Sequence, residues 1–296
     1  MWIYLILMLS TLMATGKSLF CKAIGTSKYS KRETMILNFK SFFVAFASSL
    51  LFSINRIDEI FDISIFSLVL SVFFGISVAT TQVMQAKAMG NGSSSLVTLI
   101  YSCGFLIPIF YGLIFWNEEA SIFQWIGIGL IVVALFLIIY NGKGEGKLSS
   151  WLPFAIIAML GSGINAIFQK THQYSDFANE LPLFLVCSLL FSAVFTGIAT
   201  LFIKESKSEK IQLSKKEKTI KILVPICLGI CVGALNFLNL MLSGKIPSAI
   251  LFPIYNIGSL ILTSVISAII FKDRITKKQF VGLAIGVIAI LMVGVL

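Results

Sequence analysis

Ten runs of about twenty apolar residues, separated by mostly short polar connections, restrict the folds open to this sequence. A run of this length matches the roughly 20 residues that an α-helix needs to cross the hydrocarbon core of a bilayer. Charged residues make up only 12% of the chain, against about 25% in soluble proteins. We therefore predict an all-α integral membrane protein with ten transmembrane helices in a lipid bilayer. The segments are 2–24, 34–54, 64–86, 94–116, 121–141, 151–170, 181–203, 220–242, 248–271 and 277–296.

The basic residues are distributed unevenly between alternate connections, which predicts the orientation of the helices. When residues at the segment ends are counted with the connections, eighteen of the 23 lysines and arginines follow odd-numbered segments, seven of them in residues 204–221, and three follow even-numbered segments. The other two, Lys17 and Lys40, lie within segments. Cytoplasmic connections are enriched in Lys and Arg. Loop 204–221 is therefore predicted to be cytoplasmic and both termini outside, in a bacterial-type inner (plasma) membrane. The net charge of +10 then follows from topology, and we expect no nucleic-acid partner.

The two halves of the chain are similar when the second is shifted over the first. A shift of about 154 residues aligns GISVATTQVMQ at 75–85 with GICVGALNFLN at 229–239, and a shift of about 148 aligns Lys17 with Asn165. Because each repeat has five helices, an odd number, the second copy enters the membrane upside down. We predict two inverted five-helix repeats, 1–141 and 151–296, an architecture of many secondary transporters, whose substrate site lies where the repeats meet.

Lys17 is the residue within the apolar segments that most needs an explanation. A lysine at the middle of a bilayer helix costs about 2.5 to 3.5 kcal/mol on insertion scales. Its side chain either faces a central cavity or extends toward the cytoplasmic headgroups near Lys22. Its repeat equivalent Asn165 is followed one turn later by Gln169. The two equivalent helices thus direct a cation and neutral amides toward the same central space.

Further amides and tyrosines at repeat-equivalent positions complete the predicted site. Two amide pairs, on the third and eighth segments, have i, i+3 spacing, so each pair shares one helix face. These amides either bind a substrate or bond each other between helices, and the tyrosines either close the cavity walls or pack. The predicted substrate-binding residues are Lys17, Asn165, Gln169, Gln82, Gln85, Asn236, Asn239, Tyr101, Tyr255 and Asn256.

The distribution of acidic residues restricts the substrate class and the reaction types. All thirteen lie in connections or at segment ends, and the sole histidine, His172, follows the sixth segment. With no carboxylate at the midplane to bind a proton or an organic cation, an anionic or zwitterionic substrate paired with Lys17 is favoured. An enzyme would need a His/Asp/Glu cluster or an activated nucleophile at membrane depth. We predict no catalytic residue, no metal site and no cofactor.

A duplicated motif links this sequence to a known family. A polar segment ends in a glycine turn (QAKAMGNGSSS and NLMLSGKIPSA), and an acidic residue is later followed by Ser/Thr, Gln and Gly (NEEASIFQWIG and KDRITKKQFVG). On these motifs the chain resembles the drug/metabolite transporter superfamily, specifically its EamA-type members with two five-helix repeats. The resemblance leaves the substrate open, because similar proteins move amino acids, sugars, sugar phosphates and nucleobases. It also implies cytoplasmic termini, whereas the prediction made here follows the charge count.

Taken together, the sequence predicts a secondary transporter of a small polar metabolite that works by alternating access. The expected substrates are amino acids, organic acids or phosphorylated compounds. Two alternatives stay open: a channel or structural membrane protein, and a transporter of a neutral or cationic compound in which Lys17 is structural. A homodimer is also left open.

Overall fold

The computed structural model describes a helical protein. The described residues are 2–26, 29–53, 62–115, 121–139, 150–203, 215–243, 245, 248–272 and 277–295, and no β-strand occurs among them. The helices are α1 (Trp2–Gly25), α2 (Lys31–Phe52), α3 (Ile65–Asn91), α4 (Ser94–Ser102), η2 (Cys103–Phe105), α5 (Leu106–Phe115), α6 (Ile122–Ile139), α7 (Leu152–Gln173), η3 (Ala178–Glu180), α8 (Leu181–Phe202), α9 (Lys215–Ser243), α10 (Ser248–Ile270) and α11 (Lys277–Val295).

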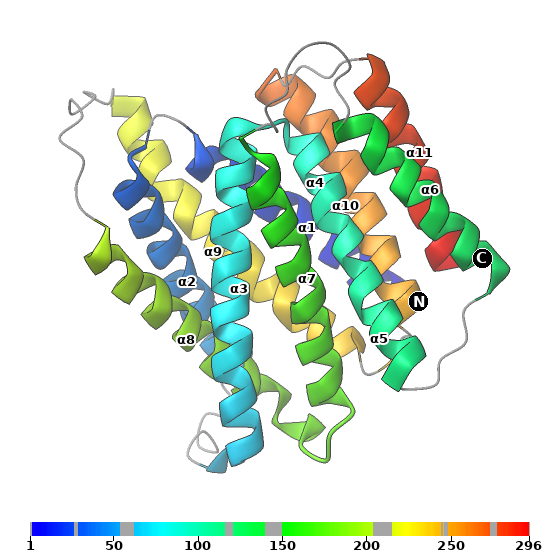
Figure 1. Ribbon diagram of the computed structural model, residues 1–296. Helices are drawn as coiled ribbons and strands as arrows, with labels where there is room; N and C mark the ends of the chain where they lie inside the picture. Colours follow the sequence, from blue (N-terminus) through cyan, green and yellow to red (C-terminus); the bar gives the residue numbers. More distant parts are fainter. Residues whose placement is uncertain are drawn as a thin grey trace.

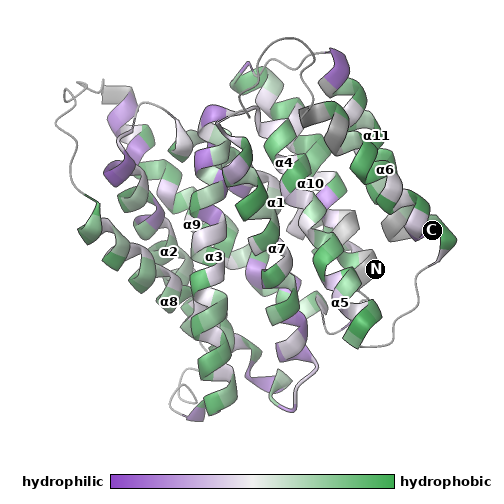
Figure 2. Cartoon of the chain, in the orientation of Figure 1, coloured by the Kyte–Doolittle hydropathy of each residue, from purple (hydrophilic) through white to green (hydrophobic). Residues whose placement is uncertain are grey.

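Every apolar segment predicted from the sequence forms helix. Within the described residues, seven helical stretches are long and apolar enough to cross a membrane, and three shorter apolar stretches lie in α6, α10 and α11. The number of membrane crossings therefore stays a prediction. In Figure 2 hydrophobic residues cover the middle of the helices, while hydrophilic residues gather toward several helix ends. This is the distribution expected of helices whose ends meet headgroups and water.

Several helix boundaries differ from the sequence prediction, among them those of α2, α3 and α9. Helix α2 begins three residues early because Ser30 and Glu33 form a capping box, each side chain accepting from the other's backbone N–H. Helix α3 continues five residues further, to Asn91. Helix α9 begins at Lys215, so the end of the predicted loop 204–221 is helical. Residues 204–214 of that loop lie outside the described residues.

The fourth predicted helix is not continuous. It consists of α4 and α5 joined by the 3-10 turn η2. Pro108 lacks an N–H, so it cannot donate to the carbonyl of Gly104 four residues earlier. Gly104 also lies against α7, where a Cβ atom would collide with the Met159 carbonyl and the Ser162 hydroxyl. The proline and this close approach account for the break.

Contacts between helices follow the equivalence of the two halves. Helix α3 packs on α7 and α1 packs on α9, while α2 packs on α9 and α3 packs on α8. When each helix is exchanged for its equivalent in the other half, the contact of α3 with α7 becomes that of α9 with α1. The contact of α2 with α9 likewise becomes that of α8 with α3. Helices α6 and α11 pack on each other, as do α2 and α8. In Figure 1, α2, α8 and α9 lie on one side of the molecule and α6 and α11 on the other, with α3 and α7 between.

Two hydrophobic cores hold the two sides together. One is built mainly from buried residues of α1, α2, α3, α7, α8 and α9, including Phe42, Phe74 and Phe184. The other lies among α4, η2, α5, α6, α10 and α11, around Leu99, Ile131 and other aliphatic side chains. Helices α4 and α7 contribute to both cores.

Both ends of α3 are fixed by neighbouring elements. At its C-terminal end, Gly90 and Gly25 bring the backbones of α3 and α1 together, since a Cβ on either would collide with a backbone carbonyl of the other helix. There the Lys22 ammonium donates to the Gly92 carbonyl over 2.8 Å. At the N-terminal end the Ser64 hydroxyl donates to the Glu180 carboxylate over 2.7 Å. The position of α3, which carries several polar side chains, is thus well determined.

Candidate functional site

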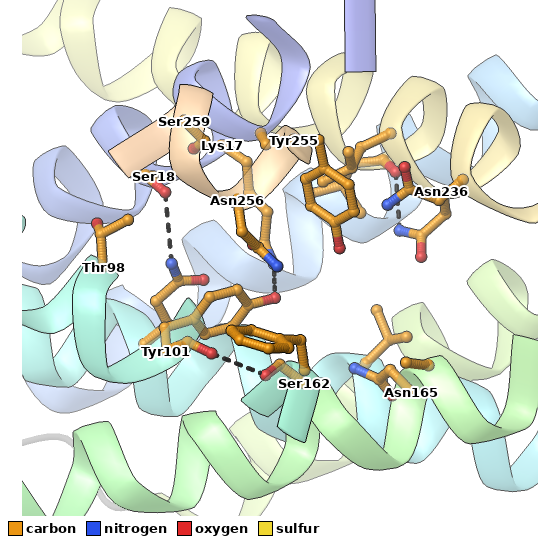
Figure 3. Close-up of a pocket in the computed structure, with 18 of the residues that line it drawn as sticks. Lys17, Ser18, Thr98, Tyr101, Ser162, Asn165, Asn236, Tyr255, Asn256 and Ser259 are labelled. Atoms are coloured by element: carbon orange, nitrogen blue, oxygen red, sulfur yellow. Dashed lines mark hydrogen bonds between the residues drawn. The ribbon is translucent and has the colours of Figure 1, made fainter. Parts of the chain in front are cut away.

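A polar cavity lies between the two halves of the chain. Its volume is about 60 Å³, measured over the positions open to the centre of a water molecule, which is room for a few waters. Side chains of α1, α3, α4, η2, α7, α9 and α10 form its walls, and Figure 3 shows most of them. Nine of the ten residues predicted from the sequence line this cavity: Lys17, Gln85, Tyr101, Asn165, Gln169, Asn236, Asn239, Tyr255 and Asn256.

Lys17 supplies positive charge to the cavity. Its ammonium donates a hydrogen bond to the Tyr101 hydroxyl over 3.0 Å and lies 4.8 Å from the centroid of the Tyr101 ring. Figure 3 shows the lysine side chain extended toward this hydroxyl. An ammonium has three donors, so two N–H groups remain beyond the bond to Tyr101. No acidic residue is among the described residues that line the cavity.

The wall opposite Tyr101 is formed by its repeat equivalent and two asparagines. The Tyr255 hydroxyl lies within hydrogen-bonding range of the Asn239 and Asn256 side chains. Asn239 is 4% exposed, and its carbonyl oxygen accepts from the Ser10 hydroxyl on α1 over 2.6 Å. These contacts connect α1, α9 and α10, so Ser10 of the first half helps to hold a wall built from the second half.

Two amide contacts connect further pairs of helices. The Gln169 amide on α7 donates to the Asn236 carbonyl oxygen on α9 over 3.3 Å. The Asn165 amide on α7 donates to the Thr81 hydroxyl on α3 over 3.3 Å. Each bond occupies only one end of an amide group. The predicted alternative, in which the amides form hydrogen bonds between helices, therefore accounts for one end of the Asn165 and Gln169 amides and not for the other end.

Gln85 is the most deeply buried of the cavity amides. Its side chain is 0% exposed, and its N–H lies 3.5 Å from the Ser18 hydroxyl, the long limit of a hydrogen bond. Its carbonyl oxygen has no hydrogen-bond partner among the described residues. The same holds for the Asn165 carbonyl oxygen and the Thr98 hydroxyl, which also line the cavity.

Gln82 lies apart from the other nine predicted residues. Its amide donates to the Asn38 carbonyl oxygen and to the Ser41 hydroxyl of α2, both over 3.0 Å. Asn38 is held in place by donating to the Thr34 carbonyl. Helix α8, the equivalent of α2, contains no Asn or Gln, whereas Asn236, the equivalent of Gln82, lines the cavity. Asn38 on α2 thus explains why the Gln82 amide lies outside the cavity while its equivalent, Asn236, lines it.

Four polar cavity residues were not among the predicted site residues: Ser18, Thr98, Ser162 and Ser259. Serine and threonine in membrane helices commonly bond the backbone of the preceding turn, so they give a weak signal in the sequence. Ser162 does this, donating to the Met159 carbonyl as well as to the Tyr101 carbonyl. Ser18 and Ser162 both lie one turn or less from a predicted residue, and that proximity is the signal that could have identified them.

Comparison with models of protein families identifies the family of this chain. The model of the EamA-like transporter family matches residues 1–140 and again residues 149–295. The chain belongs to this EamA-like transporter family. The double match agrees with the duplication seen in the sequence, and the protein is therefore a multi-pass membrane protein of a transporter family.

Two further comparisons add less to the description of this EamA-like transporter. No curated protein matches it at the significance required. A solved structure described only as "Crystal structure of protein" is similar with a TM-score of 0.63, at 13% identity over 96% of this chain and 95% of that chain. That similarity concerns the fold alone.

Proposed function

We propose that this EamA-like protein is a secondary transporter of a small anionic or zwitterionic metabolite, such as an amino acid, an organic acid or a phosphorylated compound. The observation that carries the proposal is Lys17, a cation inside an amide-lined cavity whose described lining contains no carboxylate. A buried charge needs a partner, and the Tyr101 hydroxyl is a neutral one. A carboxylate or phosphate of the substrate would complete the pairing.

The proposed mechanism is alternating access between two inverted five-helix repeats, 1–141 and 151–296, with ten membrane crossings in all. Three observations support it. The family model matches each half, the interhelical contacts are equivalent between the halves, and the cavity is lined by both. In transporters built this way, one repeat or bundle moves against the other around a fixed site.

The proposed orientation places both termini outside and loop 204–221 in the cytoplasm of a cell with a bacterial-type inner membrane. The distribution of Lys and Arg in the sequence supports this orientation. Accessibility labelling of single cysteines introduced at either terminus tests it.

The first experiment measures saturable uptake and counterflow in proteoliposomes, together with ligand-induced thermal shifts in detergent. The panel contains amino acids, organic acids, sugar phosphates, nucleosides and organic cations. We expect an acidic or zwitterionic compound to stabilise the wild type, since ligand binding to the folded state raises its stability. Replacing Lys17 by methionine should weaken binding about 10- to 100-fold, the size of one charged hydrogen bond.

Lys218→Met is a matched control, because it removes the same charge from an exposed position at the start of α9. This variant should bind like the wild type. If only neutral or cationic compounds bind, or if Lys17→Met transports at the full rate, Lys17 is structural and the proposed substrate class is wrong. Flux that does not saturate and shows no counterflow would instead indicate a channel.

A further inference from the structure

The cavity of this transporter contains hydrogen-bond acceptors whose orientation is determined by their neighbours. The Thr81 hydroxyl donates its only hydrogen to the Ser77 carbonyl over 2.6 Å. It can therefore only accept from Asn165, which must present its N–H to Thr81. The carbonyl oxygen of Asn165 is left as a buried acceptor, and no described residue donates to it.

The orientation of the Gln169 amide is determined in the same way. The Asn236 amide donates to the Val232 carbonyl over 2.9 Å, so Asn236 presents its carbonyl oxygen to Gln169. Gln169 must then use its N–H in that contact, which turns its own carbonyl oxygen away from Asn236. Together with the unpartnered oxygens of Gln85 and Thr98, the cavity carries a set of acceptors on α3, α4 and α7.

These acceptors lie in the same cavity as Lys17 but on other side chains. An acceptor buried without a donor is destabilising, so a ligand that supplies donors gains binding energy there. An ammonium group supplies three N–H donors and no acceptor. A second carboxylate or a phosphate dianion would instead place negative oxygens against carbonyl oxygens. A cation without a carboxylate would meet Lys17 with nothing to neutralise it.

From this arrangement we infer that the site takes a small zwitterion, with its carboxylate at Lys17 and Tyr101 and its ammonium at the carbonyl oxygens of Asn165 and Gln169, which lie one helical turn apart on α7. The inference rests on the proposed transport function and narrows its substrate class to compounds of the α-amino acid type. The two oxygens come from α7 and Lys17 comes from α1, so the ligand would connect helices of both halves.

The test compares matched probes that differ only in the group carried by the α-carbon. L-alanine, L-leucine and L-phenylalanine are titrated beside L-lactate, L-2-hydroxyisocaproate and L-phenyllactate, with succinate and inorganic phosphate as anions. The wild type in detergent is expected to bind at least one amino acid about 10- to 100-fold more tightly than its hydroxy acid, the range of a charged hydrogen bond. Asn165→Leu should lower amino-acid affinity about tenfold and change hydroxy-acid affinity less than about threefold.

Two further variants keep the test decisive. Asn165→Asp retains the size of the side chain and the acceptor that faces the cavity, replaces the N–H that faces Thr81 by oxygen, and adds negative charge. It should increase the preference for the amino acid over the hydroxy acid. Gln82→Leu removes a buried amide that contacts α2 instead of the cavity. It should lower thermal stability but leave the preference unchanged.

The outcomes separate this inference from the proposed function. Equal or tighter binding of hydroxy acids, succinate or phosphate, lost in Lys17→Met, would overturn the zwitterion and leave an anion transporter. An unchanged preference in both Asn165 variants, or a panel in which no amino acid binds, would overturn it as well. The transport function itself fails only if proteoliposomes show no saturable uptake of any compound.

Discussion

Replacing Gly90 by alanine should destabilise the protein through the contact between α3 and α1. A Cβ at Gly90 would lie against the carbonyl oxygen of Gly25, well inside the 3.0 Å that Cβ atoms keep from other heavy atoms. The obstacle is backbone, so no side-chain rotation can relieve it, and the two helices must separate. Overpacking costs about 1 to 3 kcal/mol and occasionally more, and we expect about 3 kcal/mol here.

Part of this cost is offset, and the offset can be measured separately. Alanine is favoured over glycine inside a helix by about 1 kcal/mol, so the net loss at Gly90 should be about 2 kcal/mol. Gly129 on α6 has no atom within 4 Å of the position its Cβ would take. Gly129→Ala should therefore be neutral or stabilising by up to about 1 kcal/mol.

The assay is thermal or denaturant unfolding of the purified variants in the same detergent. The two alanine variants should differ by about 3 kcal/mol, since both gain helix propensity and only one introduces a clash. If Gly90→Ala and Gly129→Ala have the same unfolding free energy, α3 and α1 do not pack as closely as described. The reasoning from the Gly25–Gly90 contact would then be refuted.

Three other substitutions test separate parts of the structure. Tyr101→Phe removes the hydroxyl that accepts from Lys17 and should weaken substrate binding by about 0.5 to 1.5 kcal/mol, measured by titration, while unchanged affinity would exclude a role for that hydroxyl. Gln82→Leu breaks two hydrogen bonds to α2 and should lower the free energy of unfolding by about 1 to 2 kcal/mol. If this variant instead kept the stability of the wild type and lost substrate binding, Gln82 would belong to the binding site. Ser30→Ala removes the cap of α2 and should cost about 1 kcal/mol, and a stability equal to that of the wild type would contradict the capping box.

Much of the cavity could be predicted because polar residues in apolar segments are few and the chain is duplicated. Lys17 and Asn165 were predicted to face one space from equivalent helices, and both line the cavity. The duplication supplied spatial information that a single helix cannot, since it paired residues almost 150 positions apart. Tyr101 and Tyr255, also paired by the duplication, both line that cavity.

Gln82 shows where this reasoning stops. Its spacing from Gln85 is that of one helix face, yet a face is wide enough to meet two neighbouring helices. Gln85 contacts α1 through Ser18, whereas Gln82 contacts α2 through Asn38. Whether a glutamine of α3 bonds α1 or α2 depends on how these three helices pack. The spacing of residues along α3 alone does not determine that packing. The break at η2 likewise depends on a contact with α7 as well as on Pro108.

The positive charge of Lys17 has an electrical consequence for transport. A charge that crosses the membrane field gains or loses about 2.3 kcal/mol per 100 mV. A zwitterion adds no net charge to the ammonium of Lys17, so the loaded and the empty carrier respond to voltage alike, and a complete cycle moves no charge. A monoanion would neutralise the loaded form and leave the empty form charged, so that net uptake produces a current. For transport without a coupled ion, recording from a planar bilayer would therefore give the net charge of the cargo.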